Sequence, residues 1–193
     1  MKTKYLFIAF IIVAIVQLSV PFKMIYDSEI TEKNGTVYRF KTAPIDPTDP
    51  FRGKYIALNY ELNSFITKDT TWTAGQEVYL LLDTDKDGFA KVKGISRKRP
   101  DSGTDYINTS IMHNFKGKLM FDLPFDVFYM EESKALEAET GYAEYSRRRD
   151  AKPAYALVAV LNGNAVLKDV IVDDIPIREY VLRERNKTAA KAD

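Results

Sequence analysis

The side chains best suited to chemistry are carboxylates, and one group of them alternates along Asp83, Asp85 and Asp87. This spacing imitates the first ligands of a helix–loop–helix calcium site, which also needs a glutamate at its twelfth position and a helix on each side. Here the twelfth position is Gly94, and both flanks alternate like strands. The segment therefore predicts a hairpin turn, with a weak surface calcium contact as the alternative.

A second acidic group is the pair Glu131 and Glu132, which precedes a run of helix-forming residues. Carboxylates in a first helical turn complement the positive end of the helix dipole. Alternatively, Glu131 with Asp122 or Asp126 could form an acid–base pair. Nothing in the sequence sets their separation, so we favour the helix-dipole interpretation.

Other catalytic chemistry finds little support. The chain has no cysteine, which excludes thiol nucleophiles, thiolate metal sites and disulfides. Its single histidine, His113, cannot form a histidine cluster for a metal. No serine lies in a recognisable nucleophile motif. We therefore expect no cofactor and no catalysis.

Composition and charge restrict the class of protein further. With 193 residues and 46% apolar residues, the chain can form one domain with a sizeable core. Its 28 basic and 27 acidic side chains leave a net charge of +1, which argues against nucleic acid as a partner.

The amino-terminal segment decides on which side of a membrane the rest of the chain lies. Residues 1–4 contain Lys2 and Lys4, and residues 5–22 are almost entirely apolar. This pattern predicts a transmembrane anchor with residues 1–4 in the cytoplasm and a main domain, residues 23–185, on the far side. A cleaved signal peptide is the alternative, but bulky residues and Pro21 stand where its cleavage site needs small ones.

The rest of the chain predicts antiparallel strands. Asn34-Gly35 is typical of a hairpin turn, and two further hairpins are expected at residues 77–95 and 154–173. Residues 131–149 have helical periodicity, whereas residues 186–193 form a polar tail with no reason to fold. The predicted fold is mainly β with one or two helices, of the α+β class.

An internal similarity suggests a duplicated β unit, with possible halves at residues 36–100 and 101–180. Phe51-Arg52-Gly53-Lys54 matches Phe115-Lys116-Gly117-Lys118, and residues 88–95 match residues 163–170. Two such units would pair to bury one core, because a small sheet cannot bury its apolar face alone. Chance similarity between strands is the alternative.

The central stretch of the chain is residues 44–60, in which three prolines precede a turn at Arg52-Gly53 and a strand. Alternation directs Ile56, Leu58 and Tyr60 to one face, where we expect core. Tyr55 could form an exposed recognition edge together with Arg52 and Lys54. Arg52 could instead hydrogen-bond Asp46 or Asp49 and hold the proline loop, which we favour.

Gly53 to Tyr60 resembles the signature of the bacterial GDYxxLxY protein family, and the preceding proline-rich segment is similar to that family's lead-in. The resemblance covers most of the chain, including one amino-terminal hydrophobic segment followed by a β-rich domain. This sequence has Lys54 where the family pattern has an acid, which favours a structural role for the motif. The family is functionally uncharacterised, so the resemblance implies no reaction. It implies a bacterial cytoplasmic membrane and, because members occur beside multi-pass membrane proteins, a membrane partner.

Three hypotheses for function follow. The first is a membrane-anchored extracytoplasmic module that contacts an envelope or membrane protein, with Arg52, Gly53, Lys54, Tyr55, Leu58 and Tyr60 as candidate contact residues. The second is a hydrolase of envelope material that uses carboxylates of the second half. The third is a small-ligand or calcium-binding domain built on the Asp83–Asp87 turn.

Overall fold

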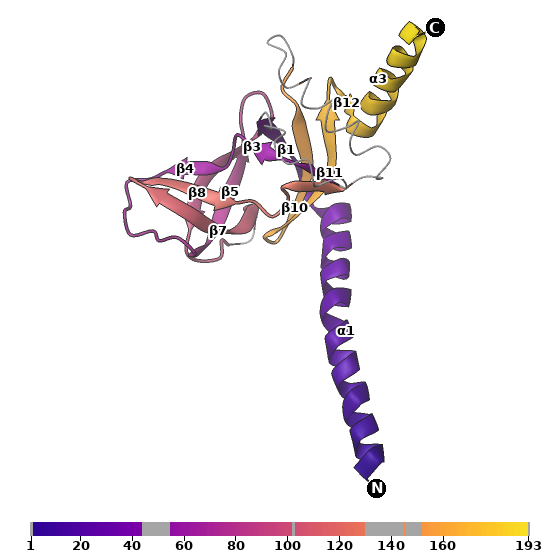
Figure 1. Cartoon of the computed structure of the whole chain (residues 1–193). Coiled ribbons are helices and arrows are strands. Elements are labelled where there is room, and N and C mark those ends of the chain that lie inside the picture. Colours follow the sequence, from indigo (N-terminus) through magenta and orange to yellow (C-terminus); the bar gives the residue numbers. More distant parts are fainter. Residues whose placement is uncertain (1, 44–54, 102, 130–144, 146–151, 193) are drawn as a thin grey trace.

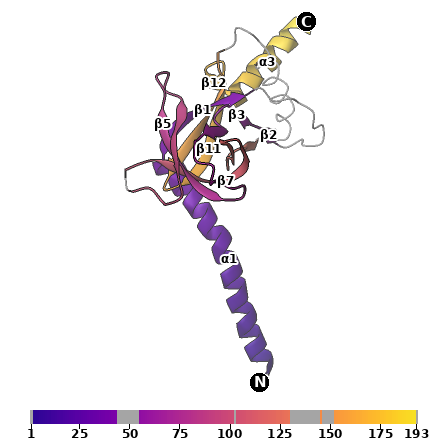
Figure 2. The ribbon, with the colours of Figure 1, turned by 90° about the vertical axis from the view of Figure 1, so that its left-hand side faces the viewer.

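A computed structural model describes residues 2–43, 55–101, 103–129, 145 and 152–192, and it shows a mainly β body with a helix at each end (Figure 1). Helix α1 (Lys2–Asn34) extends away from the body, and helix α3 (Ile177–Ala192) lies at the opposite end (Figures 1 and 2). The predicted α+β class with a dominant β component is confirmed.

Three antiparallel sheets form the body. The first has the order β12-β11-β10-β1-β3, with strands Ile175–Pro176, Asn164–Val172, Tyr155–Leu161, Thr36–Ala43 and Asn59–Tyr60. The second has the order β4-β8-β7-β5-β6, with strands Ser64–Ile66, Lys118–Asp122, Tyr106–Phe115, Glu77–Thr84 and Ala90–Ser96. A short third sheet pairs β2 (Tyr55–Ala57) with β9 (Val127–Tyr129). Both predicted hairpins, β5–β6 and β10–β11, are confirmed.

Helix α1 continues well beyond the apolar segment predicted at residues 5–22. Ion pairs one helical turn apart, Lys23 with Asp27 and Lys33 with Glu29, support this polar continuation. The predicted hairpin turn at Asn34-Gly35 is wrong, because the Gly35 backbone N–H donates to the Thr31 carbonyl at 2.9 Å and ends the helix. Asn-Gly suits a helix end as well as a hairpin turn, because glycine is the commonest residue just past a helix.

The structure also differs from the polar tail predicted at residues 186–193, because α3 extends to Ala192. Ile177, Tyr180 and Val181 form one buried face of this helix, and these contacts nucleate it. Alanine and lysine have high helix propensity, and extending an existing helix costs far less free energy than forming its first turn. These residues therefore continue the helix. The helix predicted at residues 131–149 lies outside the described residues, apart from Tyr145.

The strand pairing repeats between the two hairpins. A bulge opposite Leu81–Leu82 leaves Lys93 without a paired residue, and a bulge opposite Leu157–Val158 does the same for Lys168. Lys93 and Lys168 are matched residues of the similarity in the sequence. Bulges are local features of a given backbone, so this coincidence supports a structural repeat.

The hairpins are exchanged between the two large sheets. Hairpin β5–β6 pairs through β5 with β7, whereas hairpin β10–β11 pairs through β10 with β1. The first hairpin therefore lies in one sheet with β7 and β8, which come later in the chain. The second hairpin lies in one sheet with β1, the first strand of the chain. The two halves cannot form their sheets separately.

A glycine in each hairpin turn approaches an inner strand of the opposite sheet. A Cβ at Gly88 would lie 2.1 Å from Arg39 Nη2 on β1, and a Cβ at Gly163 would lie 2.7 Å from Tyr106 Cε2 on β7. Both glycines have a positive φ, 77° and 92°. Beside them, Phe40 and Ile107 are fully buried in a core shared by both sheets.

We predict that Gly163→Ala destabilises the protein by about 3 kcal/mol, from left-handed backbone strain plus overpacking against Tyr106. Gly75→Ala is the matched control, because Gly75 has φ 79° but no atom within 4 Å of the added Cβ. It should cost about 1–2 kcal/mol from backbone strain alone. Urea unfolding of the full chain in detergent micelles measures both, and equal losses would contradict the close contact.

Candidate functional site

The described part of the signature strand faces the core. Leu58 is 2% exposed and Tyr60 is 3% exposed, whereas Asn59 between them is exposed, so the predicted alternation is confirmed there. The Leu58 backbone N–H donates to the Asp126 carbonyl, and the Tyr60 hydroxyl donates to the Phe125 carbonyl at 2.7 Å. Leu58 and Tyr60 therefore form part of the core and stabilise the fold, and their contact with a partner stays a prediction.

An aromatic cluster forms around Tyr60. The Phe40, Tyr60 and Phe125 rings meet edge to face, with centroids 4.9 to 5.9 Å apart. Such contacts add to the free energy gained from burial alone. The cluster joins β1, β3 and the turn before β9, so the signature strand connects two sheets.

The remaining signature residues are only partly visible. The backbone of Tyr55 lies in β2, opposite Tyr129. Arg52, Gly53 and Lys54 lie outside the described residues, so a bond from Arg52 to Asp46 or Asp49 stays a prediction. The acidic pair Glu131 and Glu132 also lies outside them.

Asp122 and Asp126 line one hollow next to the signature strand. Its volume is about 390 Å³. Asn59 and Asn63 add amide groups to its wall, and Leu58, Tyr60, Met112, Met120, Phe121 and Leu123 supply the apolar lining. Both aspartates are candidate acid–base residues by sequence, but no sequence pattern predicted the two methionines beside them. Met112 is there because a bulge between Ile111 and His113 interrupts the pairing of β7 with β8.

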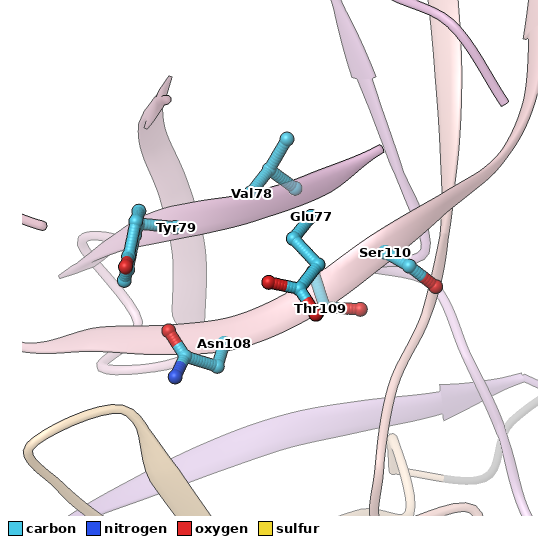
Figure 3. A pocket seen from close by; sticks show the side chains of 6 residues that line it. All are labelled: Glu77, Val78, Tyr79, Asn108, Thr109 and Ser110. Carbon is cyan, nitrogen blue, oxygen red and sulfur yellow. The ribbon is translucent and has the colours of Figure 1, made fainter. Parts of the chain in front are cut away.

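A second hollow, of about 230 Å³, lies on β5 and β7 (Figure 3). Glu77, Asn108 and Ser110 supply its polar groups, and Val78, Tyr79 and Thr109 complete the lining. Sequence reasoning missed this site, because Glu77 comes next to Asn108 and Ser110 only through the pairing of β5 with β7.

The Asp83–Asp87 segment is a hairpin turn, as predicted. Asp85 Oδ1 accepts backbone N–H groups of Asp87 and Phe89, so this carboxylate holds the turn. Asp83 lies 3.3 Å from the Lys91 ammonium, and its pKa is lowered first by the Thr84 backbone N–H and then by Lys91.

The positively charged side chain of Arg39 binds the backbone carbonyl groups of this turn. The Arg39 guanidinium donates to the Asp87 carbonyl at 2.8 Å and to the Gly88 carbonyl at 3.0 Å, and it stacks on Phe89 and Tyr155. Within the described ranges, no three acidic or histidine side chains are close enough to hold a metal ion. Through these bonds Arg39 connects β1 to the β5–β6 hairpin.

Tyr60→Phe tests the structural role of the signature strand. Removing the hydroxyl leaves the buried Phe125 carbonyl without this donor, so we expect a loss of about 1–2 kcal/mol in unfolding free energy. Tyr79→Phe is the control, since the Tyr79 ring contacts Tyr106 and its hydroxyl forms no hydrogen bond with another residue in the described part of the chain. Thermal unfolding of the full chain distinguishes them, and an unchanged Tyr60→Phe midpoint would refute the structural role.

Comparisons with known proteins identify one family. No curated protein and no solved structure matches the chain. The model of the GDYXXLXY protein family matches residues 17–170, which span about half of α1 and nearly the whole β body. That match covers well over half of the sequence, and the chain therefore belongs to the GDYXXLXY protein family.

Proposed function

We propose that this protein is a single-pass, membrane-anchored module of the bacterial cytoplasmic membrane, whose β body lies on the extracytoplasmic side and contacts another membrane or envelope protein without catalysis. The observation that carries this proposal is the direct junction between α1 and the sheet. Helix α1 is long and apolar enough to cross a membrane, and its apolar window is not buried by the body.

The dimensions of α1 fit this role. A helix of 33 residues is about 50 Å long, and about 20 residues cross the hydrocarbon core. About a dozen residues then remain to hold the body beyond the bilayer. Lys2 and Lys4 favour a cytoplasmic amino terminus.

The junction leaves no flexible linker. Thr31 is 1% exposed at the end of α1, and β1 begins two residues after the helix ends. A Cβ at Gly35 would lie 2.5 Å from the Thr31 carbonyl oxygen and 2.9 Å from that of Val160 on β10. Lys168 on β11 donates to the Glu32 carbonyl at 3.0 Å. The body is thus held in one orientation relative to α1, which favours contact with a partner fixed in the same membrane.

Within α1, Gln17 supplies a polar group for such a contact. It lies in the apolar segment and is exposed. A polar side chain in a membrane helix stabilises association by hydrogen bonding to a neighbouring helix. We therefore assign the intramembrane part of the partner contact to the face of α1 that carries Gln17.

Protease protection tests the topology. In spheroplasts, added protease should degrade a tag placed after residue 193 and spare a tag placed before Met1, because α1 separates the two compartments. Detergent lysis, which exposes both tags, is the control. Protection of the carboxy-terminal tag in intact spheroplasts would overturn the proposed orientation.

Co-purification from solubilised membranes tests the partner. The tagged full chain should recover one reproducible membrane protein, and Gln17→Leu should reduce its yield several-fold. The control, Leu18→Ile, keeps the helix apolar and should leave the yield unchanged. Failure to recover any reproducible partner, together with full cellular function of an anchor-free form, would refute the proposal.

A further inference from the structure

An exposed apolar strip crosses the outer face of the sheet β4-β8-β7-β5-β6. We call it the outer strip and define it by Ile66, Met112, Phe115 and Met120, which are 79%, 48%, 71% and 37% exposed. Contiguous apolar patches of this kind on a folded protein mark interaction sites.

Strand register shows that these side chains share one face. Ile66 on β4 and Phe115 on β7 both pair with Lys118 on β8, and paired residues of adjacent strands point to the same face. Met120 follows Lys118 by two residues on β8 and so points the same way. Met112 lines the same hollow as Met120.

Opposite charges flank the outer strip. Lys116 lies in the β7–β8 turn, Lys118 lies on β8 between Ile66 and Phe115, and Asp122 and Asp126 lie at the other end, beside the 390 Å³ hollow. All four side chains are exposed, and none forms an ion pair with another residue of the described part of the chain. By contrast, the acids on the neighbouring surfaces are paired, for example Asp83 with Lys91 and Asp69 with Arg97.

We propose that the outer strip is a docking surface for a second copy of this chain. A two-fold axis near Met120 reverses the direction of β8, so Lys118 of one copy faces Asp122 of the other, twice. The Met120 side chains of the two copies then meet at the centre of a symmetric interface, and Ile66 and Phe115 lie beside Lys118 on either side of that centre. The hollow beside Asp122 and Asp126 receives a lysine of the second copy. Because the net charge of the chain is only +1, electrostatic repulsion between two copies is weak.

The strand direction is compatible with two copies anchored in the same membrane. Of the arguments for the dimer, this one alone rests on the proposed membrane anchoring. Strand β8 runs across the direction of α1 (Figure 1). A two-fold axis parallel to α1 therefore reverses the strand direction while both anchors enter the same bilayer side by side.

Single cysteines test this interface cleanly, because the natural chain contains none. Met120→Cys lies near the proposed axis and should cross-link to itself through a short bismaleimide in the purified full chain in detergent. Val37→Cys is the control, since Val37 is 49% exposed on β1, away from the outer strip. We expect a several-fold higher dimer yield at position 120, and equal or lower yield there would overturn the proposal.

Cross-linking between two different variants tests the two-fold pairing. Differently tagged chains carrying Lys118→Cys and Asp122→Cys should cross-link to each other more than either links to itself. The opposite order would refute this arrangement of copies.

Charge reversal supplies a second readout that does not depend on cysteine. Lys118→Asp or Asp122→Lys alone should weaken dimerisation about tenfold, because each change breaks the pair twice in a symmetric interface. The double variant Lys118→Asp with Asp122→Lys should recover it. Failure of this recovery would contradict the pairing.

The test separates this proposal from the partner contact of α1. Dimer cross-linking should persist in the Gln17→Leu background. When the same cysteines are probed in native membranes, linkage of position 120 to a different protein in place of a second copy would assign the outer strip to that protein and overturn self-association.

Discussion

The exchange of hairpins between the two large sheets is the constraint on which the rest of the structure depends. Each hairpin turn approaches an inner strand of the opposite sheet closely, at Gly88 against the Arg39 guanidinium and at Gly163 against the Tyr106 ring, and both glycines have a positive φ. Neither sheet can bury its apolar face without strands from both halves of the body. Residues such as Phe40 and Ile107 therefore belong to one shared core, and the body should unfold as one cooperative unit.

The same core fixes helix α1. Helix α1 ends against β10 and β11 and continues directly into β1, which is an inner strand of the first sheet. Motion of the helix end relative to the body would disturb the close approach of Gly35 to the backbone of Val160 on β10, which cannot be relieved by a side-chain rotation. A helix joined to the body in this way holds the body in a fixed orientation, as the proposed contacts with a membrane partner and with a second copy require.

The family signature acquires a physical meaning in this structure. Leu58 and Tyr60 connect β3 to the core, and the Tyr60 hydroxyl satisfies a buried carbonyl. A motif that stabilises the fold constrains its members without implying a shared reaction. The surfaces that differ from ordinary solvated faces lie elsewhere, on the outer strip and on α1.

The sequence by itself determined the features that depend on local periodicity and composition: the apolar amino-terminal helix, the two hairpins, and the buried face of Leu58 and Tyr60. It misjudged Asn34-Gly35 and residues 186–192, because the same residues suit a turn, a tail or a helix end until tertiary contacts choose between them. Only the tertiary structure decided that the hairpins are exchanged and that Arg39 occupies the acidic turn. It also brought Met112, Met120, Asp122 and Asp126 together. These features depend on pairing between residues far apart in the chain, which no short-range pattern records.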